Sequence, residues 1–318
     1  MATEYDNAQA RASVNGDPIE KDYGSNTGYQ NGKNGAGASH LNDTNMSQGD
    51  ALHRIGTAGS ISISAELFEK IYLSPQNAVK GDLRKTFGNP TPVALIGFLI
   101  CLSPLSAALM GWRGAGGSGA ATTGAYYFFG GVLMLVGGIL EFILGNTFPF
   151  VVFMSFGAFW LSFAATLQPF YGAYAAFSPD PTNPAAGLQT VGFTASYAFL
   201  LVSMGVLCFI YLVCALRTNF IFVVMFFTLT LAYPLLAGTY WQLANSIAQA
   251  DPSKAALAGR LEIAAGACLF VTCVAGWYLL FAIMLATLDF PIQLPVGDLS
   301  TMFKGASEKA KARESQMA

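Results

Sequence analysis

The sequence predicts an all-α integral membrane protein with six transmembrane helices, arranged as three two-helix repeats around a central path. Two observations come first. The 318 residues are 53% apolar and only 11% charged, whereas a soluble domain carries about 25% charged residues. The charge is also uneven, because residues 89–288 hold 8 of the 34 charged side chains. A long apolar middle between polar ends indicates one membrane domain. The net charge of −2 argues against a nucleic-acid partner, which requires a basic face.

Residues 1–60 form a polar head to this domain. They are rich in Gly, Asn, Ser and Asp and hold few large apolar side chains, a composition that buries too little surface to fold alone. We expect a disordered cytoplasmic tail here. We expect no cleavable signal peptide, because the chain lacks a charged start followed by an apolar core. The two Asn-X-Ser/Thr triplets at Asn42 and Asn45 have no role in a cytoplasmic tail.

Residues 61–87 are expected to form an amphipathic juxtamembrane segment. Leu67, Phe68, Ile71 and Tyr72 recur at helical spacing, a pattern typical of a helix that lies on the membrane surface. A helix packed against the cytoplasmic end of the bundle fits the same pattern equally well.

Six apolar stretches within residues 88–288 are long enough to cross a bilayer, which takes roughly 20 helical residues at about 1.5 Å each. Short connections favour antiparallel neighbours, and an even number of spans places both termini on one side. Slightly more basic residues lie next to the spans on the side of the termini than on the opposite side. The positive-inside rule therefore predicts cytoplasmic termini, including a C-terminal tail at 289–318. The expected spans are 91–112, 124–145, 149–174, 190–216, 220–242 and 263–287.

Three odd-numbered spans open with an asparagine, and a large apolar residue follows nine or ten positions later. Three two-helix units around an axis normal to the membrane would bring the asparagines to one level and the apolar residues to a deeper one. This predicts a polar vestibule above a hydrophobic constriction that gates by excluding water. The alternative is that each asparagine is simply a helix N-cap. The vestibule residues are Asn89, Asn146 and Asn219, and the constriction residues are Phe98, Phe156 and Leu229.

Glu141 is the one deeply placed acid of the second span. Gly130, Met134, Gly137 and Glu141 follow one another at spacings of four, three and four, so they share a helix face. Small residues let another backbone approach closely, and Glu141 therefore faces protein or the path rather than lipid. Two interpretations stay open, a structural hydrogen-bond acceptor or a proton or gating residue. Both histidines of the chain lie in the N-terminal tail, so no histidine relay crosses the membrane.

The chain carries no motif that indicates an enzyme, a metal site or a cofactor. Residues 114–119 match the GxGxxG pattern, but they join two spans and no strand precedes them. All five cysteines lie in apolar runs without the close pairing of a zinc or redox site. We therefore expect packing roles for the cysteines, and transport rather than catalysis.

Several stretches resemble the acetate uptake transporter family, which includes bacterial succinate/acetate permeases and fungal acetate and ammonia transport proteins. GNPTPVALIGF at 88–98 resembles the family's Asn-Pro signature. FFGGVLMLVGGILEFILGNTF at 128–148 and FGAFWLSFA at 156–164 resemble its second and third spans, and LPVGDLS at 294–300 resembles the C-terminal segment of fungal members. The resemblance implies six helices per subunit, a homo-hexamer, and a separate path through each subunit for small monocarboxylates, often proton-coupled.

The resemblance also implies that apolar residues of spans one, three and five narrow the path, and they fall on Phe98, Phe156 and Leu229. The function predicted is a plasma-membrane transporter or channel for acetate or a related short monocarboxylate. One alternative is an ammonia or ammonium exporter of the same fold, since an uncharged constriction passes a small neutral molecule. A second alternative is a membrane sensor or scaffold without transport, whose tail binds regulators.

Overall fold

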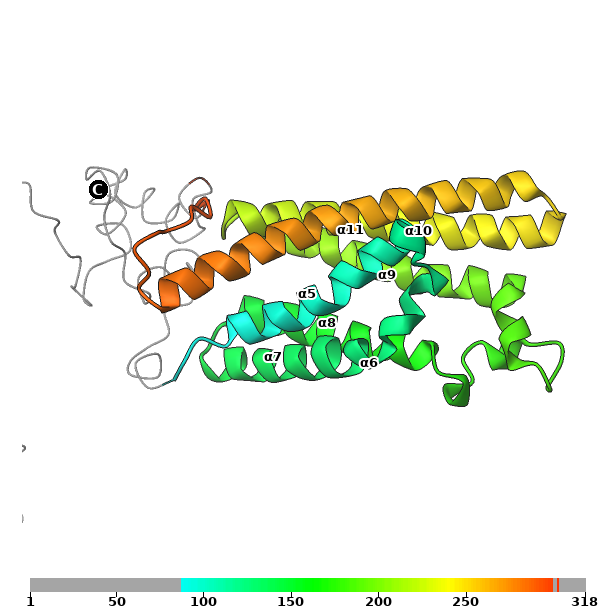
Figure 1. The fold of residues 1–318 in the computed structure, drawn as a ribbon, viewed down its shortest axis with the longest axis horizontal. Coiled ribbons are helices and arrows are strands. Elements are labelled where there is room, and N and C mark those ends of the chain that lie inside the picture. The colour runs from blue at the N-terminus through cyan, green and yellow to red at the C-terminus, as the bar shows by residue number, and fades with distance from the viewer. Residues whose placement is uncertain (1–86, 300–301, 303–318) are drawn as a thin grey trace, which may run out of the picture. The chain divides into compact units, whose positions relative to one another are not determined.

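The structure is a computed structural model that describes residues 87–299 and residue 302. The expected tail 1–60, the segment 61–87 apart from its last residue, and nearly all of 300–318 lie outside the described residues. Over the described range the chain is helical and forms no strand, and six helices are long and apolar enough to cross a membrane. This confirms the predicted all-α membrane fold with six spans (Figure 1).

Each span is one long helix, except the second, which consists of several shorter helical segments. In chain order they are α5 (Thr91–Leu109), η2 (Trp112–Gly114), η3 (Gly117–Thr122), α6 (Thr123–Ala125), η4 (Tyr126–Leu133), α7 (Met134–Ile143), α8 (Thr147–Thr166), η5 (Pro169–Tyr171), η6 (Ala175–Phe177), η7 (Pro184–Gln189), α9 (Val191–Ala215), α10 (Phe220–Gln249) and α11 (Pro252–Thr287).

The third span is shorter than the predicted 149–174. α8 ends at Thr166, because Pro169 disfavours the helical conformation in the residue before it, and Gln168 is extended there with ψ of 127°. The connection to α9 therefore covers residues 167–190 and folds into three short 3-10 turns. The expectation of short connections is wrong for this one.

The last two helices are longer than the predicted spans 220–242 and 263–287. α10 has 30 residues and α11 has 36, which makes them about 45 Å and about 54 Å long, more than the hydrocarbon core requires. Asp251 starts α11, because its carboxylate accepts a hydrogen bond from the backbone N–H of Ser253 at 2.9 Å and Pro252 takes the first helical position. The same contacts with Ser253 lower the pKa of the Asp251 carboxyl from its ordinary value.

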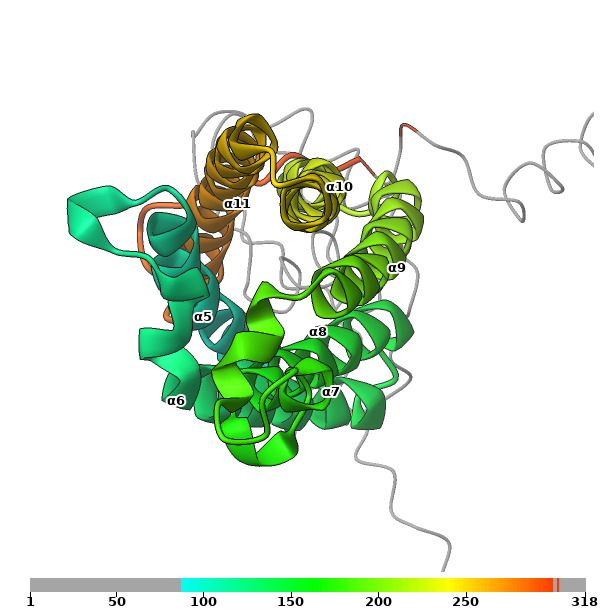
Figure 2. The ribbon, with the colours of Figure 1, turned by 90° about the vertical axis from the view of Figure 1, so that its right-hand side faces the viewer.

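Seen end-on, the six spans form a ring (Figure 2). α5 packs against α7 and α11, α10 packs against α9 and α11, and α8 packs against α7 and η4. The first and last of the three predicted helix pairs are therefore closely packed hairpins. The middle pair, α8 and α9, meets through side chains: the Tyr211 hydroxyl lies 2.9 Å from the Ser155 hydroxyl, and the Tyr211 and Phe156 rings are 6.4 Å apart.

Glycines of α5 and the second span let these helices approach closely. A Cβ at Gly97 would lie 2.5 Å from the Phe129 carbonyl oxygen, and a Cβ at Gly137 would lie 2.7 Å from the Ala94 Cβ. Phe129 lies in η4, a π-helix whose backbone hydrogen bonds join residues five apart. The small-residue face of the second span therefore faces protein, as the sequence predicts.

Replacing Gly97 with alanine is expected to destabilise the protein by about 1–3 kcal/mol, because its Cβ would overlap a backbone oxygen that has no flexible end to move away. Gly259→Ala is the matched control: it lies in α11 with nothing within 4 Å of the added Cβ, and alanine favours the helix by up to about 1 kcal/mol. Thermal unfolding of the purified variants in detergent measures both, and equal melting temperatures for the two would contradict this packing.

Candidate functional site

The three predicted vestibule asparagines lie at the N-terminal ends of α5, α8 and α10, and each makes a different contact. The Asn219 side chain is a true N-cap: its oxygen accepts a hydrogen bond from the backbone N–H of Phe222 at 2.9 Å. Asn89, one position before the cap of α5, accepts from the Thr91 N–H at 2.9 Å. Asn146 occupies the cap position of α8, but its side chain points to a different partner.

That partner is Glu141. Its Oε2 accepts a hydrogen bond from Asn146 Nδ2 at 2.6 Å, and its Oε1 accepts one from the Thr91 hydroxyl. The side chain is fully buried and lies two residues before the end of α7. Glu141 therefore lies at the end of the bundle where α5 and α8 begin, rather than deep in the middle of its span.

The Glu141 carboxyl thus ties together the starts of α5 and α8 and the end of α7. It is the only charged side chain that is buried among the described residues. A buried carboxylate is tolerated only with donors around it, and the Thr91 hydroxyl and the Asn146 carboxamide are two of them. We refer to Thr91, Glu141 and Asn146 as the entrance network.

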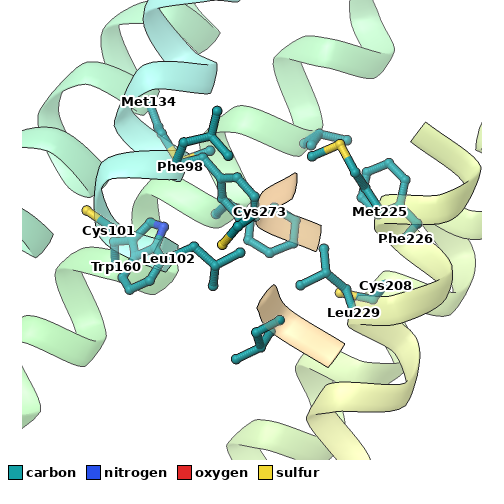
Figure 3. Close-up of a cluster of buried hydrophobic side chains, with 14 of the residues drawn as sticks. Phe98, Cys101, Leu102, Met134, Trp160, Cys208, Met225, Phe226, Leu229 and Cys273 are labelled. Atoms are coloured by element: carbon teal, nitrogen blue, oxygen red, sulfur yellow. The ribbon is translucent and has the colours of Figure 1, made fainter. Parts of the chain in front are cut away.

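The predicted constriction residues come from three different spans and join one buried apolar cluster. The Phe98 and Phe156 rings pack edge to face with centroids 5.6 Å apart and planes at 76°. Leu229 is 2% exposed, and Figure 3 shows it on α10, directed toward the side of the cluster that Phe98 and Leu102 of α5 occupy. Phe98 and Phe156 thus contact each other directly, and Leu229 belongs to the same buried cluster.

Hydroxyl groups border this layer, and sequence reasoning missed them. Ser155 pairs with Tyr211 as described above, and the Thr228 hydroxyl lies 2.7 Å from that of Thr272. A signal was present: Ser155 directly precedes Phe156, and Thr228 directly precedes Leu229. Consecutive side chains on a helix point about 100° apart. Ser155 and Thr228 therefore place their hydroxyl groups beside the predicted constriction residues rather than among them.

The C-terminal segment 294–299 was expected to belong to the tail, and it lies along the start of α10. The backbone N–H of Phe220 donates to the Gly297 carbonyl at 2.7 Å, and the Leu299 N–H donates to the Thr218 carbonyl at 3.1 Å. Val296 is 1% exposed. This segment helps to bury Asn219, which is 0% exposed.

Substituting Glu141 with leucine is expected to lower the free energy of unfolding by about 2–6 kcal/mol, because the buried Thr91 and Asn146 donors each lose an acceptor at a cost of about 1–3 kcal/mol. Glu262→Leu in α11 is the control, since this glutamate is partly exposed and its loss is expected to change stability by about 0.5 kcal/mol or less. Denaturant unfolding followed by tryptophan fluorescence provides the comparison. Similar free energies of unfolding for the two variants would mean that the entrance network does not stabilise the fold.

Comparison with known proteins gives a consistent set of relatives. The GPR1/FUN34/yaaH family model matches residues 73–301. The chain is 52% identical to protein alcS of Aspergillus fumigatus, covering 76% of this chain and 86% of that one. It is 33% identical to acetate transporter protein patA of Aspergillus clavatus, covering 68% and 80%.

Two further matches have lower sequence identity. The chain is 27% identical to ammonia transport outward protein 2 of Saccharomyces cerevisiae, covering 67% of this chain and 77% of that one. The solved structure of the bacterial acetate channel SatP aligns with a TM-score of 0.46 at 24% identity, covering 66% of this chain and 99% of that chain. Because the family model spans well over half of its residues, the chain belongs to the GPR1/FUN34/yaaH family.

Proposed function

We propose that this multi-pass membrane protein is a plasma-membrane channel or transporter for acetate or a related short monocarboxylate. The observation that carries the proposal is the buried apolar layer of Phe98, Phe156 and Leu229, to which α5, α8 and α10 each contribute one side chain. Membership of the family and the 33% identity to an acetate transporter protein support this solute class. We place both termini in the cytoplasm and a separate path in each subunit of a homo-hexamer.

The ends of the helices favour a small anion at the entrance. α5, α8 and α10 are odd-numbered spans, so their N-termini lie at one end of the ring, and helix N-termini attract negative charge. The entrance network adds hydrogen-bonding groups but only one acid, Glu141. A solute with one carboxylate and a short apolar part is favoured there over one with several charges.

The apolar layer then selects by desolvation. Taking a charged or polar group out of water without new partners costs several kcal/mol, and the cost grows with each further charge. A monocarboxylate loses the least among carboxylates, and its protonated form loses less still. This argument supports proton coupling, for which we propose Glu141 as the titrating group because it is the only buried acid of the described chain.

Ammonia export is the second candidate, and the similarity to an ammonia transport outward protein favours it. The uncharged layer of Phe98, Phe156 and Leu229 passes a neutral molecule as readily as a protonated acid. The 33% identity to an acetate transporter protein exceeds the 27% identity to the ammonia protein, so we rank acetate first. A sensor or scaffold without transport is the outcome if no solute crosses.

Purified protein in liposomes is expected to take up labelled acetate, and Phe156→Ala is expected to raise the rate about tenfold, as when a barrier falls by about 1.4 kcal/mol. Leu229→Trp is expected to lower it by a similar factor, because the larger ring fills the layer. Phe209→Ala is the matched control, since Phe209 is 55% exposed on α9 and its loss leaves the path unchanged.

Ammonia flux measured in the same liposomes separates the candidates. Protein-dependent ammonia flux without acetate flux would favour the exporter, and no flux of either solute would favour the sensor or scaffold.

Proton coupling makes a separate prediction. Acidifying the outside from pH 7 to pH 5 is expected to stimulate acetate uptake by the unaltered protein beyond the rise seen in protein-free liposomes. Glu141→Gln is expected to lose this stimulation, because a carboxamide cannot carry the proton. Glu262→Gln serves as the control and keeps it. Full stimulation in Glu141→Gln would rule out Glu141 as the coupling group.

A further inference from the structure

Trp160 of α8 carries a buried polar group that the entrance network and the constriction leave unexplained. Its side chain is 1% exposed, and its Nε1 has no hydrogen-bond partner within the described part of the chain. An unsatisfied buried donor costs about 1–3 kcal/mol, and such groups are few in folded proteins. A donor kept in this state is one that an incoming molecule can satisfy.

Trp160 lies directly beyond the constriction. It follows Phe156 by four residues on α8, so the two rings share one face of the helix. Figure 3 shows the indole nitrogen on the edge of the Trp160 ring that faces the Phe98 and Leu102 side of the cluster. On the proposed path, a solute that passes Phe98 and Phe156 from the asparagine end comes to the level of this N–H.

The indole is held rigidly in this position. Its ring stacks on Tyr126 with centroids 5.0 Å apart and planes at 20°. Gly130 makes room for it, since a Cβ there would lie 2.5 Å from Trp160 Cγ. The ring therefore has little freedom to turn its N–H toward another acceptor.

Two polar groups beside the Trp160 ring have their hydrogen-bond partners. The Tyr126 hydroxyl donates to the Gly119 carbonyl at 2.9 Å and accepts from the Thr122 hydroxyl, and the Cys101 thiol donates to the Ala125 carbonyl at 3.2 Å. Tyr127 of η4 also has a buried hydroxyl without a hydrogen-bond partner among the described residues. Trp160 differs from it in lying on the face of α8 that carries Phe156.

We propose that the Trp160 Nε1–H binds the solute, donating a hydrogen bond to a carboxylate or carboxyl oxygen of a short monocarboxylate just beyond the constriction. This inference rests on the proposed function and names the group that receives the solute there. Ammonium has no lone pair to accept the bond, whereas a carboxylate has several. One neutral donor binds weakly, so the solute can leave again, as conduction requires.

The direct test follows the indole N–H resonances of ¹⁵N-labelled protein in detergent. The chain has four tryptophans, and Phe substitutions at 112, 241 and 277 assign the fourth signal to Trp160 by elimination, so the assignment does not depend on a Trp160 variant that folds. Sodium acetate, titrated against sodium chloride at constant ionic strength, is expected to shift the Trp160 signal saturably. The Trp277 N–H, which donates to Ser103 at 3.0 Å, is the internal control and stays in place.

Acetate uptake into liposomes supplies the second readout. Trp160→Phe removes the donor and keeps a smaller aromatic ring against Tyr126, and it is expected to raise the KM for acetate about 3- to 10-fold, the worth of one hydrogen bond. Trp277→Phe removes the indole N–H of a side chain that is 40% exposed, and it is expected to change KM less than about twofold.

The outcomes of the two readouts are distinguishable. A stationary Trp160 signal at acetate concentrations that saturate transport, or an unchanged KM in Trp160→Phe, overturns the inference and leaves the proposed function standing. Absence of acetate flux in the unaltered protein overturns the proposed function. In that case the titration still decides whether Trp160 binds a carboxylate, and a stationary signal rejects it.

Discussion

The burial of one carboxyl group is the constraint on which the packing of α5, α7 and α8 depends. Glu141 is fully buried, so donors must surround it, and they come from the first residue of α5 and the cap residue of α8. This fixes the relative heights of two helices. Phe98 lies seven residues after Thr91 and Phe156 ten after Asn146, so the network at the entrance also sets the edge-to-face contact below it.

Close packing transmits that constraint to the second span. Glycines at 97 and 137 leave no space between α5 and the π-helical and α-helical parts of this span, and Gly130 does the same for the Trp160 ring. The other side of the ring of helices is held differently, since α8 meets α9 mainly through the Tyr211 and Ser155 hydroxyls and aromatic rings. α8 therefore packs closely against the second span, and it meets α9 through side-chain contacts.

The number of membrane spans could be predicted from the sequence, because the length of each apolar stretch decides it. The asparagines that begin α8 and α10 could be predicted as well. The end of α8 was readable at Pro169 and was missed. The extra turns of α10 and α11 could not be predicted from the length of the apolar stretches, because a helix can continue beyond the bilayer with polar residues. The partners of Glu141 were not readable either, because its contacts depend on helix rotation and on residues far apart in the chain. The roles of the site residues stay predictions.

The central claim is that solute crosses each subunit between Phe98, Phe156 and Leu229. Leu229→Cys, modified with a methanethiosulfonate reagent, tests it by labelled-acetate uptake before and after modification. The controls are the unaltered protein and Phe209→Cys at an exposed position of α9. The account predicts that modification at 229 blocks uptake while modification at 209 leaves it unchanged. Uptake that persists after mass spectrometry shows complete modification at 229 would place the path elsewhere and contradict the account.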